Sequence, residues 1–221
     1  MSLWIKICGN TSLEDALLAA EAGADAVGFV FARSPRQVTS CHVEAITAKL
    51  PRSVEKIGVF VDATLAEIEV AVLDSGLTGV QLHSSGSPDL PEKLRDRFGP
   101  DLRILRVLHF SPGAVVEAAS LAADKNIDAL LADSRTEAAV GGTGIAFDWN
   151  SAVGLFQNPE AHPHLVLAGG LTPENVSHAI TTLHPWGIDV VSGVESAPGR
   201  KDAEKVRKFI ARACATNEPG R

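Results

Sequence analysis

Short runs of apolar and β-branched residues alternate with longer amphipathic segments along the whole 221-residue chain. Short apolar runs between turn residues are typical of buried strands, whereas apolar positions three and four residues apart predict helices. The pattern predicts eight strands, in chain order Trp4–Ile7, Ala26–Phe31, Lys56–Val61, Gly79–Leu82, Ile104–Leu108, Ala129–Ala132, Leu165–Ala168 and Asp189–Val191.

Amphipathic segments between and after these strands predict helices. Thr11 and Thr64 each stand three residues before a glutamate, which is the spacing of a capping box, and Pro173 suits a first helical position. Further amphipathic segments cover Val43–Leu50, Pro91–Phe98, Gly113–Ala123, Trp149–Phe156 and Ala203–Ala213.

Strand and helix alternate throughout, so each helix returns the chain to the same end of a parallel sheet. Eight such units of about 28 residues favour a single-domain (β/α)8 barrel over residues 1–213, with a polar tail over residues 214–221. The alternative is an open doubly wound sheet, but its first turn is usually glycine-rich, and here it reads Cys8-Gly9-Asn10-Thr11. We therefore predict an α/β protein with the TIM-barrel fold.

The chain is mildly acidic, with 20 Lys and Arg against 27 Asp and Glu and a formal net charge of −7. Because the basic residues are scattered, we do not expect a nucleic-acid partner. No apolar stretch reaches the roughly 18 residues of a membrane span and no export leader is recognisable, so we expect a cytoplasmic protein without a membrane partner. The three cysteines are too far apart for a disulfide framework or a metal cluster.

In a (β/α)8 barrel the active site lies at the carboxyl ends of the strands, so the residues there are the candidates for chemistry. Each also has an ordinary structural alternative, such as a tight turn, a helix cap or a solvated surface position. The candidates are Cys8, Arg36, Asp62, His83, His109, Asp133, Gly169, Gly170, Ser192 and Gly193.

Glycines favour an anion site after the last two strands. Gly169 and Gly170 stand just before a predicted helix, and Ser192 and Gly193 form a second turn of small residues. Glycine lets backbone N–H groups approach an anion, and loops at these two positions are a frequent phosphate site in barrels. The alternative is that these glycines only form tight turns. The two turns together favour a phosphorylated small molecule as ligand.

Two residues could serve as acid and base. Asp133 opens the longest glycine-rich connection, which contains Gly142 and Gly144, and a loop of this length is more often a binding loop or lid than a plain connection. In isolation this aspartate could equally be a helix cap or an ion-pair partner. Cys8 ends the first strand before Gly9, which would place its thiol at the barrel mouth, where a thiolate can act as a base. Cys41 and Cys214 are expected to be structural.

Arg36, in a Ser-Pro-Arg turn, has the planar guanidinium that suits a carboxylate or a phosphate, although an exposed arginine is more often solvated surface. His83 and His109 could be hydrogen-bond partners of a ligand or satisfied core histidines. No set of His, Asp and Glu has the spacing of a metal site, and His162 and His164 are expected at the surface.

Ordered motifs resemble those of one known enzyme family. The resemblance is collinear from residue 5 to about residue 213. It rests on Lys6-Ile7-Cys8-Gly9, Gly28-Phe29-Val30-Phe31, Ser34-Pro35-Arg36, Gly58-Val59-Phe60-Val61, Gln81-Leu82-His83, Gly141-Gly142-Thr143-Gly144, Phe147-Asp148-Trp149, Leu167-Ala168-Gly169-Gly170-Leu171-Thr172-Pro173-Glu174 and Ser192-Gly193-Val194-Glu195-Ser196-Ala197-Pro198-Gly199. The chain thus resembles phosphoribosylanthranilate isomerase of tryptophan biosynthesis.

The resemblance implies a cofactor-free Amadori rearrangement of N-(5-phosphoribosyl)anthranilate to 1-(2-carboxyphenylamino)-1-deoxyribulose 5-phosphate. It makes Asp133 the general acid that opens the ribose ring and Cys8 the general base that removes the C2′ proton. Arg36 would hold the anthranilate carboxylate, and backbone groups at Gly169, Gly170, Ser192 and Gly193 would hold the phosphate. His83, Gly142 and Gly144 complete the expected substrate-binding set.

Two alternatives stay open. The first is the related dual-substrate isomerase of histidine and tryptophan synthesis, which has an aspartate at the position of Cys8. The second is a barrel that binds phosphorylated metabolites without turnover. The sequence also leaves open whether the chain is a monomer or a homodimer.

Overall fold

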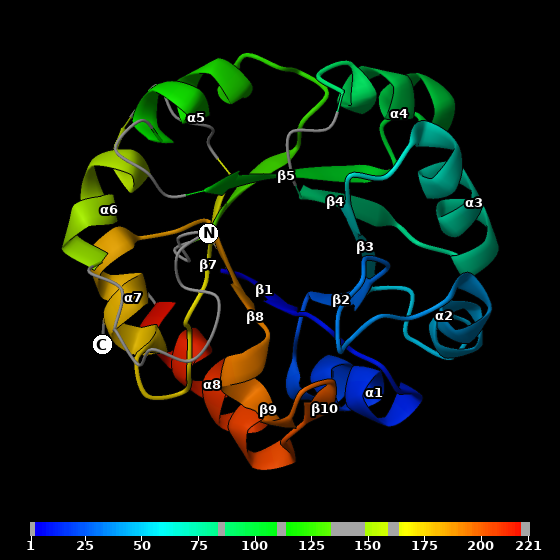
Figure 1. Ribbon diagram of the computed structural model, residues 1–221. Helices are drawn as coiled ribbons and strands as arrows, with labels where there is room; N and C mark the ends of the chain where they lie inside the picture. Colours follow the sequence, from blue (N-terminus) through cyan, green and yellow to red (C-terminus); the bar gives the residue numbers. More distant parts are fainter. Residues whose placement is uncertain (1–2, 84–86, 110–113, 134–148, 159–163, 218–221) are drawn as a thin grey trace.

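The strands form a closed barrel of eight parallel strands in sequential order, β1 to β8, as predicted. In the computed structural model, which describes residues 3–83, 87–109, 114–133, 149–158 and 164–217, the helices form a ring around the strands (Figure 1). The strands are β1 (Trp4–Ile7), β2 (Ala26–Val30), β3 (Glu55–Val61), β4 (Gly79–His83), β5 (Arg103–His109), β6 (Ala129–Asp133), β7 (Leu165–Ala168) and β8 (Gly187–Val190).

A helix follows each strand in the chain. The helices are α1 (Leu13–Ala22), α2 (Ser40–Thr47), α3 (Leu65–Ser75), α4 (Leu90–Phe98), α5 (Ala114–Ala122), α6 (Trp149–Phe156), α7 (Val176–Leu183) and α8 (Ala203–Asn217). Between β8 and α8 lie a short 3-10 helix, η1 (Ser192–Val194), and a small antiparallel hairpin of β9 (Glu195–Ala197) and β10 (Arg200–Lys201). This hairpin was not predicted, because two such short strands carry no clear period.

The barrel closes where β1 pairs with β8, so that Lys6 lies opposite Asp189 and Ile7 opposite Val190. Strands β4, β5 and β6 each extend by one residue beyond the predicted carboxyl end, to His83, His109 and Asp133. Apolar periodicity does not detect these polar ends, which are held by ladder pairing such as His109 with Asp133.

Two of the predicted helix-start signals differ from the structure. Ser12, not Thr11, caps α1, because its side chain accepts a hydrogen bond from the Asp15 N–H. Pro173 lies in the turn before α7 rather than at its first position, since α7 begins at Val176. The capping box of Thr64 and Glu67 at the start of α3 is confirmed.

Helix α8 continues to Asn217, four residues beyond the predicted end of the barrel at residue 213. Val206, Phe209, Ile210 and Ala213 on one face of this helix are buried, at the helical spacing expected of a packed face. Residues 214–217 therefore continue the last helix.

Apolar side chains fill two regions. One lies between the strands and the ring of helices, and the other fills the barrel interior, where Trp4, Ile57 and Leu105 belong to the same buried cluster. Alternate strand residues point inward, so each strand contributes to both regions. The interior is packed toward its amino-terminal end, and the hollow that could bind a ligand lies at the carboxyl end.

Candidate active site

A pocket of about 250 Å³ opens at the carboxyl ends of the strands. It brings together eight of the ten predicted catalytic and substrate-binding residues, although they are spread over most of the chain. The eight are Cys8, Arg36, His83, Asp133, Gly169, Gly170, Ser192 and Gly193. The other two, Gly142 and Gly144, lie outside the described residues.

Cys8 follows β1 and faces this pocket, but its side chain is buried and only 4% of the residue is exposed. The absence of a side chain at Gly28, on the neighbouring strand β2, makes room for the thiol. A Cβ at that position would lie 2.5 Å from Cys8 Sγ. The thiol therefore sits in the wall of the pocket rather than at an open mouth.

Burial raises the pKa of the Cys8 thiol above its usual value, against the opposing charges of Lys6 and Lys201. Both lysines lower the pKa, because a cation beside a thiol favours the thiolate, but burial together with the Asp189 carboxylate outweighs them. The resting thiol is consequently protonated at neutral pH, and the thiolate, once formed, is a strong base.

Three polar side chains lie buried in the barrel directly below the pocket opening. Lys6 Nζ donates to Asp189 Oδ1 at 3.0 Å and to Gln81 Oε1 at 2.8 Å, and none of the Lys6 surface is exposed. Burial disfavours the Lys6 charge, but the adjacent Asp189 carboxylate outweighs this and raises the pKa of Lys6. Lys6 therefore stays charged beside the Cys8 thiol, with which it interacts.

Asp133 is the last residue of β6 and is buried in the pocket wall. Its ladder neighbours are His109 on β5 and Ala168 on β7. His83 lines the same pocket, and its ring and that of His109 are arranged edge to face at a centroid distance of 5.0 Å. Cys8 and Asp133 approach the pocket from strands separated by β7 and β8, so a ligand between them would meet a different side chain on each side.

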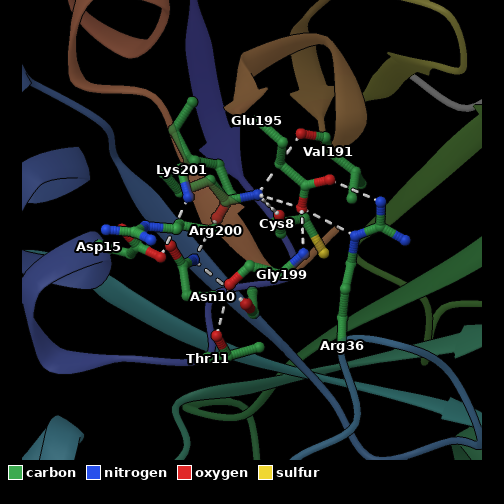
Figure 2. A network of polar contacts seen from close by, with 12 residues as sticks. Cys8, Asn10, Thr11, Asp15, Arg36, Val191, Glu195, Gly199, Arg200 and Lys201 are labelled. Carbon is green, nitrogen blue, oxygen red and sulfur yellow. Dashed lines mark hydrogen bonds and ion pairs between the residues drawn. The ribbon is translucent and has the colours of Figure 1, made fainter. Parts of the chain in front are cut away.

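Arg36 reaches the pocket from the turn after β2. Its backbone N–H donates to Ser34 Oγ at 3.0 Å, and its side chain crosses Gly9, where a Cβ would lie 2.7 Å from Arg36 Cδ. Gly9 also has a φ of +76°, which favours glycine. The Arg36 guanidinium forms a two-point ion pair with Glu195, as Figure 2 shows.

The two glycine-containing turns pack against each other. Gly169 and Gly170 have φ values of +86° and +64°, and a Cβ on Gly193 would overlap the carbonyl oxygen of Leu171. The first turn is held by Asn175, whose side chain accepts from the Thr172 N–H and donates to the Gly170 carbonyl oxygen. Glycine backbone thus contributes to the lining of this side of the pocket.

Comparison with known proteins identifies the family. Residues 5–212 match the family model described as N-(5'phosphoribosyl)anthranilate (PRA) isomerase. The chain belongs to this family. It is 43% identical over 207 residues to the N-(5'-phosphoribosyl)anthranilate isomerase of Pelobacter propionicus, covering 93% of each chain. It is also 43% identical over 210 residues to that of Geobacter sp. strain M21, covering 95% of this chain and 97% of the relative.

Solved structures of this isomerase family have the same fold. The enzyme from Thermotoga maritima superposes with a TM-score of 0.85 at 36% identity, covering 96% of this chain and 98% of the other. A phosphoribosyl anthranilate isomerase in complex with reduced 1-(o-carboxyphenylamino)-1-deoxyribulose 5-phosphate superposes with a TM-score of 0.81 at 34% identity and the same coverage. The predicted family and fold are thereby confirmed.

Sequence reasoning did not single out several buried polar residues that line this pocket or contact residues in its wall: Lys6, Gln81, Asp189, Glu195 and Lys201. A signal was present for two of them, because Lys6 and Asp189 are charged residues inside strands that are otherwise apolar. Such residues are rarely buried unless they are paired. The pairing itself joins positions 183 residues apart, which periodicity does not reveal.

Two further observations concern the described residues alone. Among them, no group of three or more His, Cys, Asp and Glu side chains is arranged to hold a metal ion. Within the same residues, no helix combines the length and the apolar character needed to cross a membrane.

Proposed function

We propose that this isomerase converts N-(5-phosphoribosyl)anthranilate into 1-(2-carboxyphenylamino)-1-deoxyribulose 5-phosphate, a step of tryptophan biosynthesis, by general acid–base catalysis. The observation that carries the proposal is the placement of Cys8 and Asp133 in one pocket, on strands that are not neighbours. An aldose-to-ketose rearrangement needs one proton donor and one proton acceptor that reach different atoms of the same sugar.

In the first step, the carboxyl group of Asp133 donates its proton to the ribose ring oxygen. The bond between that oxygen and C1′ breaks, and the nitrogen lone pair forms the C1′=N bond of a protonated Schiff base. In the second step, the Cys8 thiolate removes the C2′ proton, and the electron pair forms an enaminol. A proton added at C1′ and one lost from the C2′ hydroxyl then give the ketone, so the substrate and product have the same composition.

The remaining pocket residues bind the two anionic ends of the substrate. The turns at Gly169, Gly170, Ser192 and Gly193 present backbone to the pocket, which suits the phosphate. Arg36 supplies a positive charge for the carboxylate, and His83 lines the same pocket. A protein of net charge −7 can bind a ligand with two anionic groups in this way, because each group is attracted by the N–H groups or the guanidinium next to it and not by the charge of the whole protein.

The test is turnover by the purified full-length chain. Consumption of the fluorescent substrate N-(5-phosphoribosyl)anthranilate is expected, together with growth of a tryptophan auxotroph that lacks this isomerase. Binding without turnover would instead favour a barrel that only binds phosphorylated metabolites. Growth of a matching histidine auxotroph would favour the dual-substrate isomerase, which the cysteine at position 8 argues against.

A further inference from the structure

The β9–β10 hairpin after the last barrel strand has no role in the chemistry described above, yet it carries two buried charged side chains. Glu195 begins β9 and Lys201 ends β10, and each is only 6% exposed. Charged residues are rarely buried unless they are paired. Here the two form an ion pair, with Lys201 Nζ 3.2 Å from Glu195 Oε1.

The Glu195 carboxylate accepts hydrogen bonds from four donors. Oε1 accepts from Arg36 Nε at 2.8 Å, from the Gly199 N–H at 3.2 Å and from Lys201 Nζ at 3.2 Å. Oε2 accepts from Arg36 Nη2 at 2.6 Å. Figure 2 shows the carboxylate between the Arg36 and Lys201 side chains. Burial opposes ionisation of Glu195, but Arg36 and Lys201 outweigh it and lower the pKa of the carboxyl.

Arg36 keeps unused donors after this contact. A guanidinium has five N–H groups, and Glu195 takes one from Nε and one from Nη2. The N–H groups of Nη1 and the second N–H of Nη2 make no hydrogen bond to the described residues. These donors form the second edge of the planar group, which matches a carboxylate with two parallel hydrogen bonds. A guanidinium held on one edge thus still offers a complete edge to a ligand in the pocket.

Lys201 extends the same contact to the base. Its Nζ donates to the carbonyl oxygen of Cys8 at 2.5 Å and to that of Val191 at 3.4 Å. The hairpin is itself fixed to the start of α1, because Asp15 accepts from the Lys201 N–H at 3.1 Å and Thr11 donates to the Gly199 carbonyl oxygen. One buried ion pair therefore connects the turn that carries Arg36 to the strand end that carries Cys8.

We propose that Glu195, supported by Lys201, is a positioning residue that holds the Arg36 guanidinium by one edge so that its other edge binds the carboxylate of the substrate. This inference rests on the proposed function, in which Arg36 holds that carboxylate. Glu195 does not itself touch the substrate. Its effect is therefore specific for ligands that carry the carboxylate.

Two ligands separate this role from general destabilisation of the pocket. One is reduced 1-(2-carboxyphenylamino)-1-deoxyribulose 5-phosphate, and the other is the same compound with an unsubstituted phenyl ring. Both keep the phosphate. The expected result for Glu195→Gln is about tenfold weaker binding of the carboxylated ligand and less than about twofold weaker binding of the other. Equal losses for both ligands, or tighter binding of the carboxylated one, would overturn the proposal.

A double-mutant cycle with Arg36→Ala tests whether Glu195 acts through Arg36. In the Arg36→Ala background, Glu195→Gln is expected to change the affinity for the carboxylated ligand by less than about twofold. Full additivity of the two changes would contradict the inference. If Arg36→Ala by itself fails to discriminate between the ligands, the proposed function of Arg36 is wrong. If Arg36→Ala discriminates between the two ligands and Glu195→Gln does not, the proposed positioning role of Glu195 is wrong.

Two further variants guard against misfolding. Glu195→Asp keeps the negative charge beside Lys201 but withdraws the carboxylate from Arg36 by one methylene, and about a threefold ligand-selective loss is expected. An equal or absent loss in this variant also counts against the proposal. The matched control is Asp128→Asn, which changes the partner of a half-buried arginine at the opposite end of the barrel. It is expected to lower the melting temperature and to leave both affinities unchanged.

Discussion

Two aspartates bracket strand β6, and their surroundings differ. Asp128 precedes the strand at the amino-terminal end, where one of its oxygens accepts from Arg95 Nη2 at 2.8 Å and from the Ile104 N–H at 2.6 Å. Asp133 ends the strand at the carboxyl end and lines the pocket. The first carboxylate stabilises the junction of two strands, whereas the second is placed where a ligand can reach it.

Two arginines repeat this difference. Arg95 donates four hydrogen bonds, to the carbonyl oxygens of Gly99, Leu102 and Asn126 and to Asp128. Within the part of the chain that the structure describes, Arg36 donates two hydrogen bonds from its side chain, both to Glu195, and the other edge of the guanidinium has no partner there. At the amino-terminal end the protein's own oxygens accept hydrogen bonds from the arginine. At the carboxyl end some N–H groups of the arginine can still donate to a ligand. Substitutions at the two ends should therefore separate stability from activity.

The largest expected effect comes from the proposed acid and the proposed base. Asp133→Asn and Cys8→Ala should each lower kcat by about 10²- to 10⁴-fold, because each removes a proton-transfer group. Steady-state kinetics with the purified variants measures this. Asp128→Asn, at the other end of β6, should keep kcat within about twofold of the wild-type value. Near wild-type kcat in both pocket variants would mean that the proposed mechanism is wrong.

Two glycines at different heights in the barrel, Gly28 within β2 and Gly79 at the start of β4, give the next largest effect. Alanine at Gly28 would meet the Cys8 sulfur, so Gly28→Ala should displace the base and lower kcat by about 10- to 100-fold. Alanine at Gly79, toward the amino-terminal end, would instead meet Ile57 and the Arg103 carbonyl oxygen.

Gly79→Ala should therefore lower the free energy of unfolding by about 1–3 kcal/mol and spare kcat in the folded protein. Urea unfolding and kinetics on both variants test the pair. A loss of kcat in Gly79→Ala with kcat unchanged in Gly28→Ala would contradict the expectation that the carboxyl end serves activity and the amino-terminal end serves stability.

The pH dependence follows from the buried thiol. Burial raises the pKa of Cys8, so the thiolate should form only at a pH above the usual range of cysteine. Because only the thiolate is alkylated by iodoacetamide, the rate of Cys8 alkylation should rise about tenfold per pH unit below that pKa. Cys8→Ala should lack the label at this position. A rate of Cys8 alkylation that levels off below neutral pH would show that the surroundings lower the pKa of this thiol, which contradicts the expectation.

The smallest effect on catalysis is expected at Arg95. Arg95→Ala removes four hydrogen bonds and leaves the Asp128 carboxylate without its ion-pair partner. The free energy of unfolding should fall by about 2 kcal/mol, with kcat and KM within about twofold of wild type. Thermal unfolding and steady-state kinetics check both parts. Arg36→Ala is the matched change, and there KM should rise while kcat changes little.

Much of the fold could be predicted because barrels repeat one local pattern. Trp4–Ile7 and Leu165–Ala168 were predicted with the bounds that the structure has, since short apolar runs between turn residues define buried strands. Polar strand ends such as Asp133 were harder to assign, because pairing with a neighbouring strand rather than side-chain pattern extends them. The helix after Pro173 began later than predicted, because Asn175 stabilises a turn first.

The sequence by itself determined the order of strands and helices, the parallel barrel that follows from it, and the list of residues at the strand ends. It could do so because periodicity and chain direction are local properties. Only the tertiary structure decided that Cys8 is buried against Gly28, that Lys6 pairs with Asp189, and that Glu195 holds Arg36. All three contacts join residues that are far apart in the chain. The charged side chains of the two ion pairs can be buried because folding brings each partner within hydrogen-bond distance of the other.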